Sequence, residues 1–193
     1  MSGLITDITG CVIAGGASTR FGRDKSLFAY RGKPLIEHVL GVLSGIFETN
    51  IIIADECAKF AHLGLPCHAD LIPGMGPLGG LYTGLSAVKT PRLFAVACDM
   101  PGLDAGLIRH LASVSGAADV TVPFVDGNYE ALHAVYSKNC EPAVKKTLDA
   151  GRRRIVSFFD EVDVRKVEEE EILRYAEPGM VFGNINTMED LGV

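Results

Sequence analysis

The 193-residue sequence lacks the features that mark membrane proteins. No apolar run reaches the roughly 18 residues that a membrane span requires, although 48% of the residues are hydrophobic. Residues 1–7 contain neither a basic region nor a useful apolar segment, so we expect no secretion signal and a cytoplasmic location. The net charge of −6 also lacks the basic excess typical of proteins that bind nucleic acids or membrane surfaces, and we expect neither partner.

Cysteine is present, but not in a pattern that suggests a metal site. The five cysteines are odd in number and widely spaced, without a C-x-x-C motif or a Cys/His pair at zinc-binding spacing. They are Cys11, Cys57, Cys67, Cys98 and Cys140. We expect all five to be reduced thiols that mostly pack as small apolar residues.

No repeat, low-complexity tract or linker divides the chain, so we expect a single domain over residues 1–193. Short β-branched apolar runs alternate with segments of helical period, which predicts a three-layer α/β fold: an open, mostly parallel, Rossmann-like sheet with helices on both faces. The predicted strands are Cys11–Ala14, Ile51–Ala54, Leu93–Cys98, Val120–Val122, Leu132–Tyr136 and Val162–Val167. The predicted helices are Pro34–Leu43, Pro77–Val88, Ala105–Ser115 and Cys140–Ala150, with a further short one starting in Glu168–Glu171.

A glycine-rich loop follows the first predicted strand, where open α/β sheets bind ligands. Gly15 and Gly16 let the backbone approach a phosphate closely, and we expect their amides to cradle a triphosphate. Basic residues outnumber acidic ones by four between Arg20 and Lys33, so Arg20 and Lys25 can screen the charge of a phosphate. The loop matches neither the Walker motif nor the Rossmann G-x-G-x-x-G fingerprint.

Two carboxylates later in the chain are further candidates for the site. Asp99 ends a strand that reads as buried, where an ionised carboxylate needs a cation or hydrogen bonds, and Mg²⁺ shared with substrate phosphates meets that need. Asp70 opens an irregular loop that leads into a helix with glycines in its first turns. Those glycines indicate either the close approach of a ligand or tight packing between a helix and a strand.

The remaining polar features allow more than one interpretation. Arg152–Arg154, preceded by Lys145 and Lys146, form either a second anion site or a solvated surface. His38 and His110 lie on predicted helices, where packing or solvation explains them, whereas His133 could face a substrate or the core.

Several motifs together resemble the molybdenum cofactor guanylyltransferases over nearly the whole chain. The motifs are Ile13-Ala14-Gly15-Gly16, Arg20-Phe21-Gly22 with Asp24-Lys25, Gly32-Lys33-Pro34-Leu35, Pro73-Gly74 with Gly76-Pro77-Leu78, Cys98-Asp99-Met100-Pro101, and Asn184-Ile185-Asn186-Thr187. The paired glycines with Asp24-Lys25 resemble the guanylyl-transferring members, because cytidylyl-transferring and sugar-nucleotide relatives more often have Ala-Ala-Gly. The chain departs from the family pattern at Phe21, Ala54, Ala131 and Met188, and Ala54 puts one guanosine contact in doubt.

The resemblance implies an enzyme, a nucleotidyltransferase that moves GMP from GTP to the phosphate of molybdopterin and releases pyrophosphate. It places GTP on Ile13, Ala14, Gly15, Lys25, Asp70 and Asp99, with Mg²⁺ on Asp99, and the pterin substrate on Arg153, Arg154, Asn184 and Asn186. From the residue chemistry we add Gly16 to the phosphate cradle and assign the catalytic charges to Arg20, Lys25 and Asp99. Transient contacts with proteins that deliver molybdopterin or accept the product are also expected.

Three alternatives remain open from the sequence. The donor could be CTP, the acceptor could be a sugar phosphate, or the chain could be a nucleotide-binding protein without catalysis. Both Lys25 and Asp99 are present, which favours the enzyme, since a simple binder needs no metal carboxylate at the α-phosphate.

Overall fold

The computed structural model describes residues 3–14 and 27–185, and its centre is a twisted eight-stranded sheet. The strands are ordered β10-β7-β9-β6-β1-β4-β5, with β8 beside β7. They span Ile8–Ile13 (β1), Asn50–Ile53 (β4), Cys67–His68 (β5), Arg92–Ala97 (β6), Val120–Val125 (β7), Asn128–Tyr129 (β8), His133–Ser137 (β9) and Val164–Glu168 (β10), and a separate hairpin joins Ala29–Tyr30 (β2) to Lys33–Pro34 (β3). The predicted strands and the mostly parallel sheet are confirmed, but β9 runs antiparallel to both β6 and β7.

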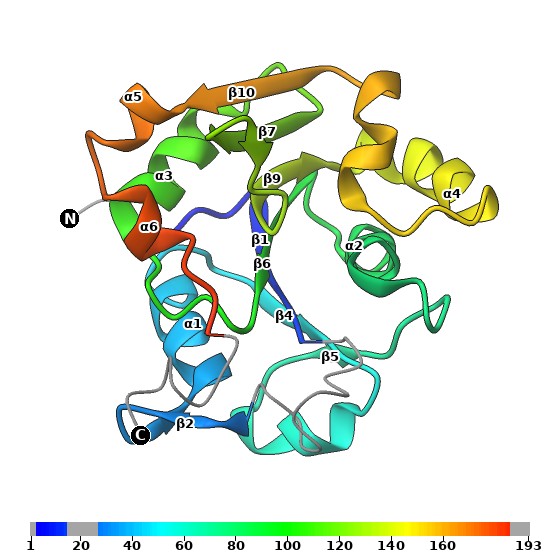
Figure 1. Ribbon diagram of the computed structural model, residues 1–193. Coiled ribbons are helices and arrows are strands. Elements are labelled where there is room, and N and C mark those ends of the chain that lie inside the picture. Colours follow the sequence, from blue (N-terminus) through cyan, green and yellow to red (C-terminus); the bar gives the residue numbers. More distant parts are fainter. Residues whose placement is uncertain (1–2, 15–26, 186–193) are drawn as a thin grey trace.

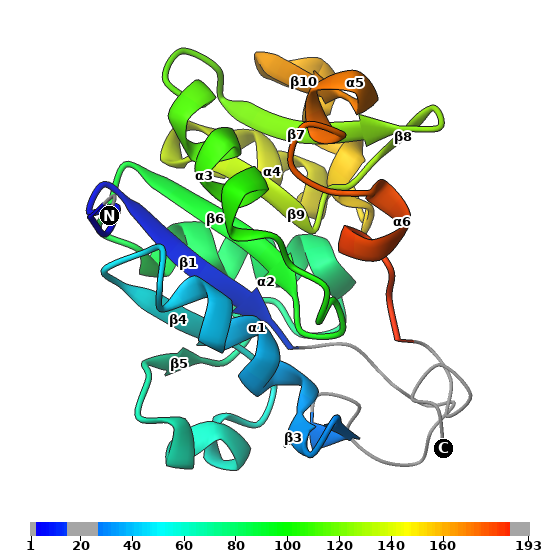
Figure 2. The same cartoon turned by 90° about the vertical axis from the view of Figure 1, so that its left-hand side faces the viewer.

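Helices cover both faces of the sheet, as the alternating pattern predicted. They span Leu35–Leu43 (α1), Gly76–Ala87 (α2), Ala105–Val114 (α3), Glu141–Asp149 (α4), Glu169–Ile172 (α5) and Pro178–Val181 (α6). Figure 1 shows α1, α3, α5 and α6 on one side of the sheet and α2 and α4 on the other, and Figure 2 shows the strands side by side from a perpendicular direction. Within the described ranges, none of the helices is long and apolar enough to cross a membrane.

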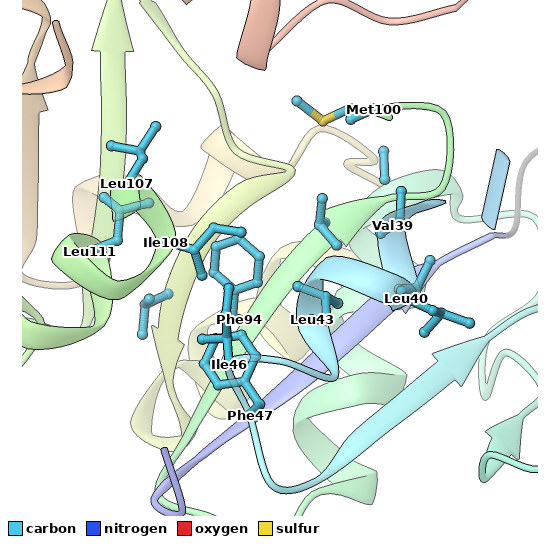
Figure 3. Packing of buried hydrophobic residues seen from close by; sticks show 14 of the residues in the cluster. Val39, Leu40, Leu43, Ile46, Phe47, Phe94, Met100, Leu107, Ile108 and Leu111 are labelled. Carbon is cyan, nitrogen blue, oxygen red and sulfur yellow. The ribbon is translucent and has the colours of Figure 1, made fainter. Parts of the chain in front are cut away.

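The core has two halves because the central strands are apolar on both faces. On β1, Val12 packs into the half formed with α1 and α3, whereas Cys11 and Ile13 pack into the half formed with α2 and α4. In the first half, Leu43 of α1 and Leu111 of α3 are completely buried. Figure 3 shows the α1 and α3 side chains gathered around the ring of β6 Phe94. Burial of each such side chain contributes about 1.5–3 kcal/mol.

Helix α2 approaches the sheet closely because glycines face the strands. A Cβ atom added to Gly80 would lie 2.8 Å from Cγ2 of Ile13, and one added to Gly84 would lie 3.1 Å from Cδ1 of Leu93. Tight packing between helix and strand therefore explains these two glycines. It also presses α2 against the last residue of β1, directly before the glycine-rich loop.

Gly80→Ala is expected to destabilise the protein by about 1–2 kcal/mol. Overpacking against Ile13 costs about 1–3 kcal/mol, and the better helix propensity of alanine recovers up to about 1 kcal/mol. Gly41→Ala in α1 is the matched control, because no atom lies within 4 Å of its added Cβ, and it should stabilise the fold. Urea unfolding of both variants checks this, and equal effects at the two positions would refute the packing argument.

The ends of α1 and α4 show how well local signals set the helix boundaries. Pro34 lies just before α1 rather than in its first turn. Helix α4 ends at Asp149, and Gly151, whose φ is +74°, lies just past its end as predicted. The amide of Gly151 donates to the carbonyl of Leu148 and that of Arg152 to Thr147, a Schellman motif.

The expectation that all cysteines are reduced is wrong for one pair. Cys57 and Cys67 form a disulfide, with their Cα atoms 5.5 Å apart, whereas Cys11, Cys98 and Cys140 are free. The pairing arises because the 3₁₀ helix at Cys57–Leu63 leads back to edge strand β5. The spatial proximity of Cys57 and Cys67 could not be predicted from the sequence, because their spacing matches no known cysteine motif.

The three notable histidines have structural surroundings. The Nε2 atom of His38 lies 2.6 Å from the carbonyl oxygen of Tyr30, and His110 stacks on Tyr175 and pairs with Glu171. His133 is fully buried, between the rings of Phe94 and Phe182, so of the two interpretations the core position holds. Neither of its ring nitrogens has a hydrogen-bond partner among the described residues.

His133 should make the fold sensitive to acid. Burial lowers the pKa of His133 from 6.5 to about 3, so between these pH values the unfolded chain binds a proton that the folded chain does not. Stability is therefore expected to fall by about 1.4 kcal/mol per pH unit on acidification through this window. His133→Leu should remove that contribution and add about 1–3 kcal/mol at pH 7, because an unpaired buried polar group is lost. Urea unfolding between pH 7 and pH 4 measures how the free energy of unfolding changes with pH, with the exposed His62→Gln as control. If His133→Leu showed the same pH dependence as the wild type, the prediction would be contradicted.

Candidate active site

The carboxyl ends of the parallel strands bring the predicted loops to one edge of the sheet. Ile13, the last residue of β1, pairs with Ala97 of β6 on one side and Ile53 of β4 on the other. Beyond the strands, the amide of Cys98 donates to the carbonyl of Ile13 at 3.3 Å, and the amide of Ala14 donates to Ile53 at 2.8 Å. The glycine-rich loop and the Asp99 loop therefore start side by side.

Five predicted positions lie outside the described residues. They are Gly15, Gly16, Arg20, Lys25 and Asn186. Of the neighbouring predicted residues, Ile13 is buried with its side chain against Gly80, so only its backbone can serve a ligand. Ala14 is half-buried at the strand end.

A cavity of about 410 Å³ opens at this edge and collects four of the predicted residues. Asp99, Arg153, Arg154 and Asn184 line it together, although they lie up to 85 positions apart (184 − 99). Its remaining lining consists of Pro77, Ala97, Met100, Glu130, Ala131, Leu132, Ile155 and Val156. Most of these are apolar, with a few converging polar groups, which is the usual composition of a small-molecule site.

The chain segments that carry Asn184 and the two arginines are anchored to the fold. Asn184 is tied to the Asp99 loop because the amide of Ile185 donates to the carbonyl of Asp99 at 3.0 Å. Arg153 and Arg154 follow the Gly151 turn of α4 and precede Ile155, which is 5% exposed. The arginines are exposed themselves, so they form a cationic rim above an anchored chain.

The basic cluster seen in the sequence divides into two parts. Lys145 pairs with Asp149 within α4, and Lys146 pairs with Glu161 at 2.7 Å. In contrast, no described carboxylate forms an ion pair with Arg153 or Arg154, which leaves both guanidinium groups available for an anion at the cavity.

Asp70 does not line the cavity but lies beyond β5, next to α2. The hydroxyl of Thr83 lies 3.5 Å from its carboxylate and accepts the amide of Leu71 at 3.0 Å. Burial raises the pKa of Asp70, and the nearby carboxylate of Asp55 raises it further, whereas Thr83 lowers it. Asp70 therefore lies outside the set of residues that line this cavity with Asp99.

Asp70→Asn is expected to raise the melting temperature at pH 7. Because the folded-state pKa is raised, ionised Asp70 costs stability above that pKa, and the cost disappears below the unfolded value of about 4. Thermal melts at pH 7 and pH 4 check the sign: the gain should be present at pH 7 and absent at pH 4. Asp160→Asn, at an exposed position, is the control, and a gain of equal size at both pH values would contradict the electrostatic origin.

Glu130 is a cavity residue that the sequence analysis missed. Residues that follow strands were the expected ligand positions, because parallel sheets bind ligands there. Strand β9 is antiparallel, so the residues that precede it lie at this edge instead. Glu130 precedes β9 and follows the turn at Asp126-Gly127, where both residues have positive φ. An Asp-Gly pair is a sequence signal for a β-hairpin, so the turn, and with it the position of Glu130 in the segment that follows, could have been predicted.

A family model described as a MobA-like NTP transferase domain matches residues 10–165. A curated relative from Pelotomaculum thermopropionicum, named a probable molybdenum cofactor guanylyltransferase, is 36% identical over 95% of this chain and 89% of its own length. This level of identity over almost the full length indicates a common family as well as a common fold.

Two solved structures share the fold. Molybdopterin-guanine dinucleotide biosynthesis protein A from Archaeoglobus fulgidus superposes with a TM-score of 0.82 at 24% identity, covering 95% of each chain. A Mycobacterium tuberculosis protein solved in complex with manganese has a TM-score of 0.64 at 18% identity, covering 84% of this chain and 88% of its own.

Proposed function

The chain belongs to the MobA-like NTP transferase family and, within it, to the molybdenum cofactor guanylyltransferases, and we propose that it transfers GMP from GTP to the phosphate of molybdopterin. The observation that carries the proposal is the shared cavity of Asp99, Arg153, Arg154 and Asn184, beside the start of the glycine-rich loop. One nucleotidyltransferase domain, residues 1–193, performs the reaction.

The reaction needs positioned charges more than a general base. A phosphate monoester has a second pKa near 6 and is mostly dianionic at neutral pH, so the molybdopterin phosphate is already a nucleophile. Its oxygen forms a bond to the α-phosphorus of GTP while the bond from that phosphorus to the bridging oxygen of the β-phosphate breaks. Pyrophosphate leaves with that electron pair, and the product contains a new P–O–P linkage.

The residues divide between the two substrates. The amides of Gly15 and Gly16 bind the triphosphate, together with the backbone at Ile13 and Ala14, and Arg20 and Lys25 neutralise its charge. Arg153 and Arg154 bind the phosphate end of the pterin substrate at the cavity rim, and Asn184 and Asn186 hydrogen bond to it. Asp70 contacts the nucleotide away from the cavity.

Asp99 suits a divalent cation, and we infer that the cation is Mg²⁺. Asp99 is half-buried and lines the cavity, and carboxylate oxygens are donors that Mg²⁺ prefers. The described residues contain no group of three metal-ligating side chains, but Mg²⁺ held by one carboxylate and substrate phosphates needs none. The manganese complex of the M. tuberculosis protein supports a divalent ion in this fold. When bound, Mg²⁺ supplies positive charge against the phosphates.

Lys25→Ala and Asp99→Ala should each lower turnover by at least about 10²-fold, the scale of one lost electrostatic group. The assay is pyrophosphate release from each of the four nucleoside triphosphates, with and without molybdopterin. Lys89→Ala and Asp160→Ala, at exposed positions, are the charge-matched controls and should retain activity. Near wild-type turnover in either site variant would refute the assignment.

The same assay decides among the alternatives. Preference for CTP, or turnover with a sugar phosphate, would replace the proposed substrates, and tight GTP binding without pyrophosphate release would indicate a binding protein.

We place the enzyme in the cytoplasm, in transient contact with proteins that deliver molybdopterin and accept the product. The Cys57–Cys67 disulfide is unusual for that compartment.

A further inference from the structure

Glu130 is the one acidic group of the cavity that the proposed reaction does not use. Its backbone is fixed on both sides: its amide donates to the carbonyl of Pro123 at 3.0 Å, and its carbonyl accepts from the amide of His133 at 2.9 Å. Glu130 lines the cavity together with Arg153, Arg154 and Asn184. The two backbone hydrogen bonds therefore hold Glu130 at the cavity where the second substrate is proposed to bind.

Within residues 3–14 and 27–185, no side chain neutralises the Glu130 carboxylate. Among the described residues, no side chain or amide donates a hydrogen bond to it, and neither cavity arginine forms an ion pair with it. Burial raises the pKa of Glu130, and no cation in the described part of the chain offsets the effect. Since a half-buried carboxylate without donors is costly, a ligand that supplies N–H donors would be bound favourably.

The walls of the cavity define the shape of that ligand. Pro77, Met100, Leu132, Ile155 and Val156 provide apolar surface, which suits a flat ring system rather than an extended polar chain. The cations lie at the exposed rim, so the anionic end of the ligand faces them. The ligand is thus a planar heterocycle with adjacent N–H donors at one end and a phosphate at the other.

We propose that Glu130 binds the 2-amino-4-oxopyrimidine edge of the pterin, accepting hydrogen bonds from its N3–H and its 2-amino group. This rests on the proposed function, which makes a pterin the second substrate. The guanine base presents the same pair of donors. The pterin is favoured because Glu130 lies in the cavity with Arg153, Arg154 and Asn184, whereas Asp70, a proposed nucleotide residue, lies outside it.

The test compares pterin with lumazine, in which an oxo group replaces the 2-amino group. The wild type should bind 6-hydroxymethylpterin at least about 10-fold more tightly than 6-hydroxymethyllumazine, because the carboxylate would face an oxygen in the latter. Glu130→Gln offers one donor and one acceptor, which match lumazine, so it should abolish or invert this preference. Fluorescence titration of both compounds gives the ratio of dissociation constants, which a purely structural role of Glu130 would leave unchanged.

Two further measurements separate the possible outcomes. In Glu130→Gln, KM for molybdopterin should rise about 10-fold or more while the dissociation constant of GTP stays unchanged; Glu130→Asp keeps the acceptors and should keep the pterin preference. Glu170→Gln, at an exposed position, is the matched control. An unchanged pterin-to-lumazine ratio, or weaker GTP binding with unchanged pterin binding, overturns the proposal whether or not the wild type turns over molybdopterin. If the wild type does not, the proposed function itself fails, and the binding ratio still decides the role of Glu130.

Discussion

The pairing of β1 with β6 is the constraint on which the rest of the site depends. The register that sets Ile13 opposite Ala97 makes the two strands end together, and the hydrogen bond from Cys98 to Ile13 extends the pairing beyond them. Two loops that are more than 80 residues apart in the sequence therefore start a few ångströms from each other. Backbone hydrogen bonds between the two buried strands fix this distance.

The antiparallel strand β9 adds a second source of side chains to the same edge. Parallel strands contribute the residues that follow them, and β9 contributes those that precede it, from Glu130 to Leu132. The amide of Ala97 donates to the carbonyl of Leu132 at 3.3 Å, which joins this segment to the end of β6. One reversed strand thus places an acidic residue opposite the loop of Asp99 and completes the cavity wall.

The sequence predicted most of this architecture and only part of the site. Strand and helix boundaries were predicted to within a few residues because apolar periodicity and local signals, such as Gly151 after α4, carry that information. The gathering of Asp99, Arg153, Arg154 and Asn184 followed from their family pattern rather than from physics. Strand direction, the Cys57–Cys67 contact and the burial of His133 depend on tertiary arrangement, which no local pattern encodes.

The distribution of charge explains how an acidic chain can bring two anionic substrates together. With a net charge of −6, the protein as a whole repels phosphates, so cations must remain unneutralised where phosphates bind. The lysines of α4 are consumed in ion pairs with Asp149 and Glu161, and they stabilise the protein surface. A few residues later the chain turns at Gly151, and Arg153 and Arg154 then lie at the cavity rim. No carboxylate among the described residues forms an ion pair with them. The helix end thus separates charges that serve the fold from charges that can serve the substrate.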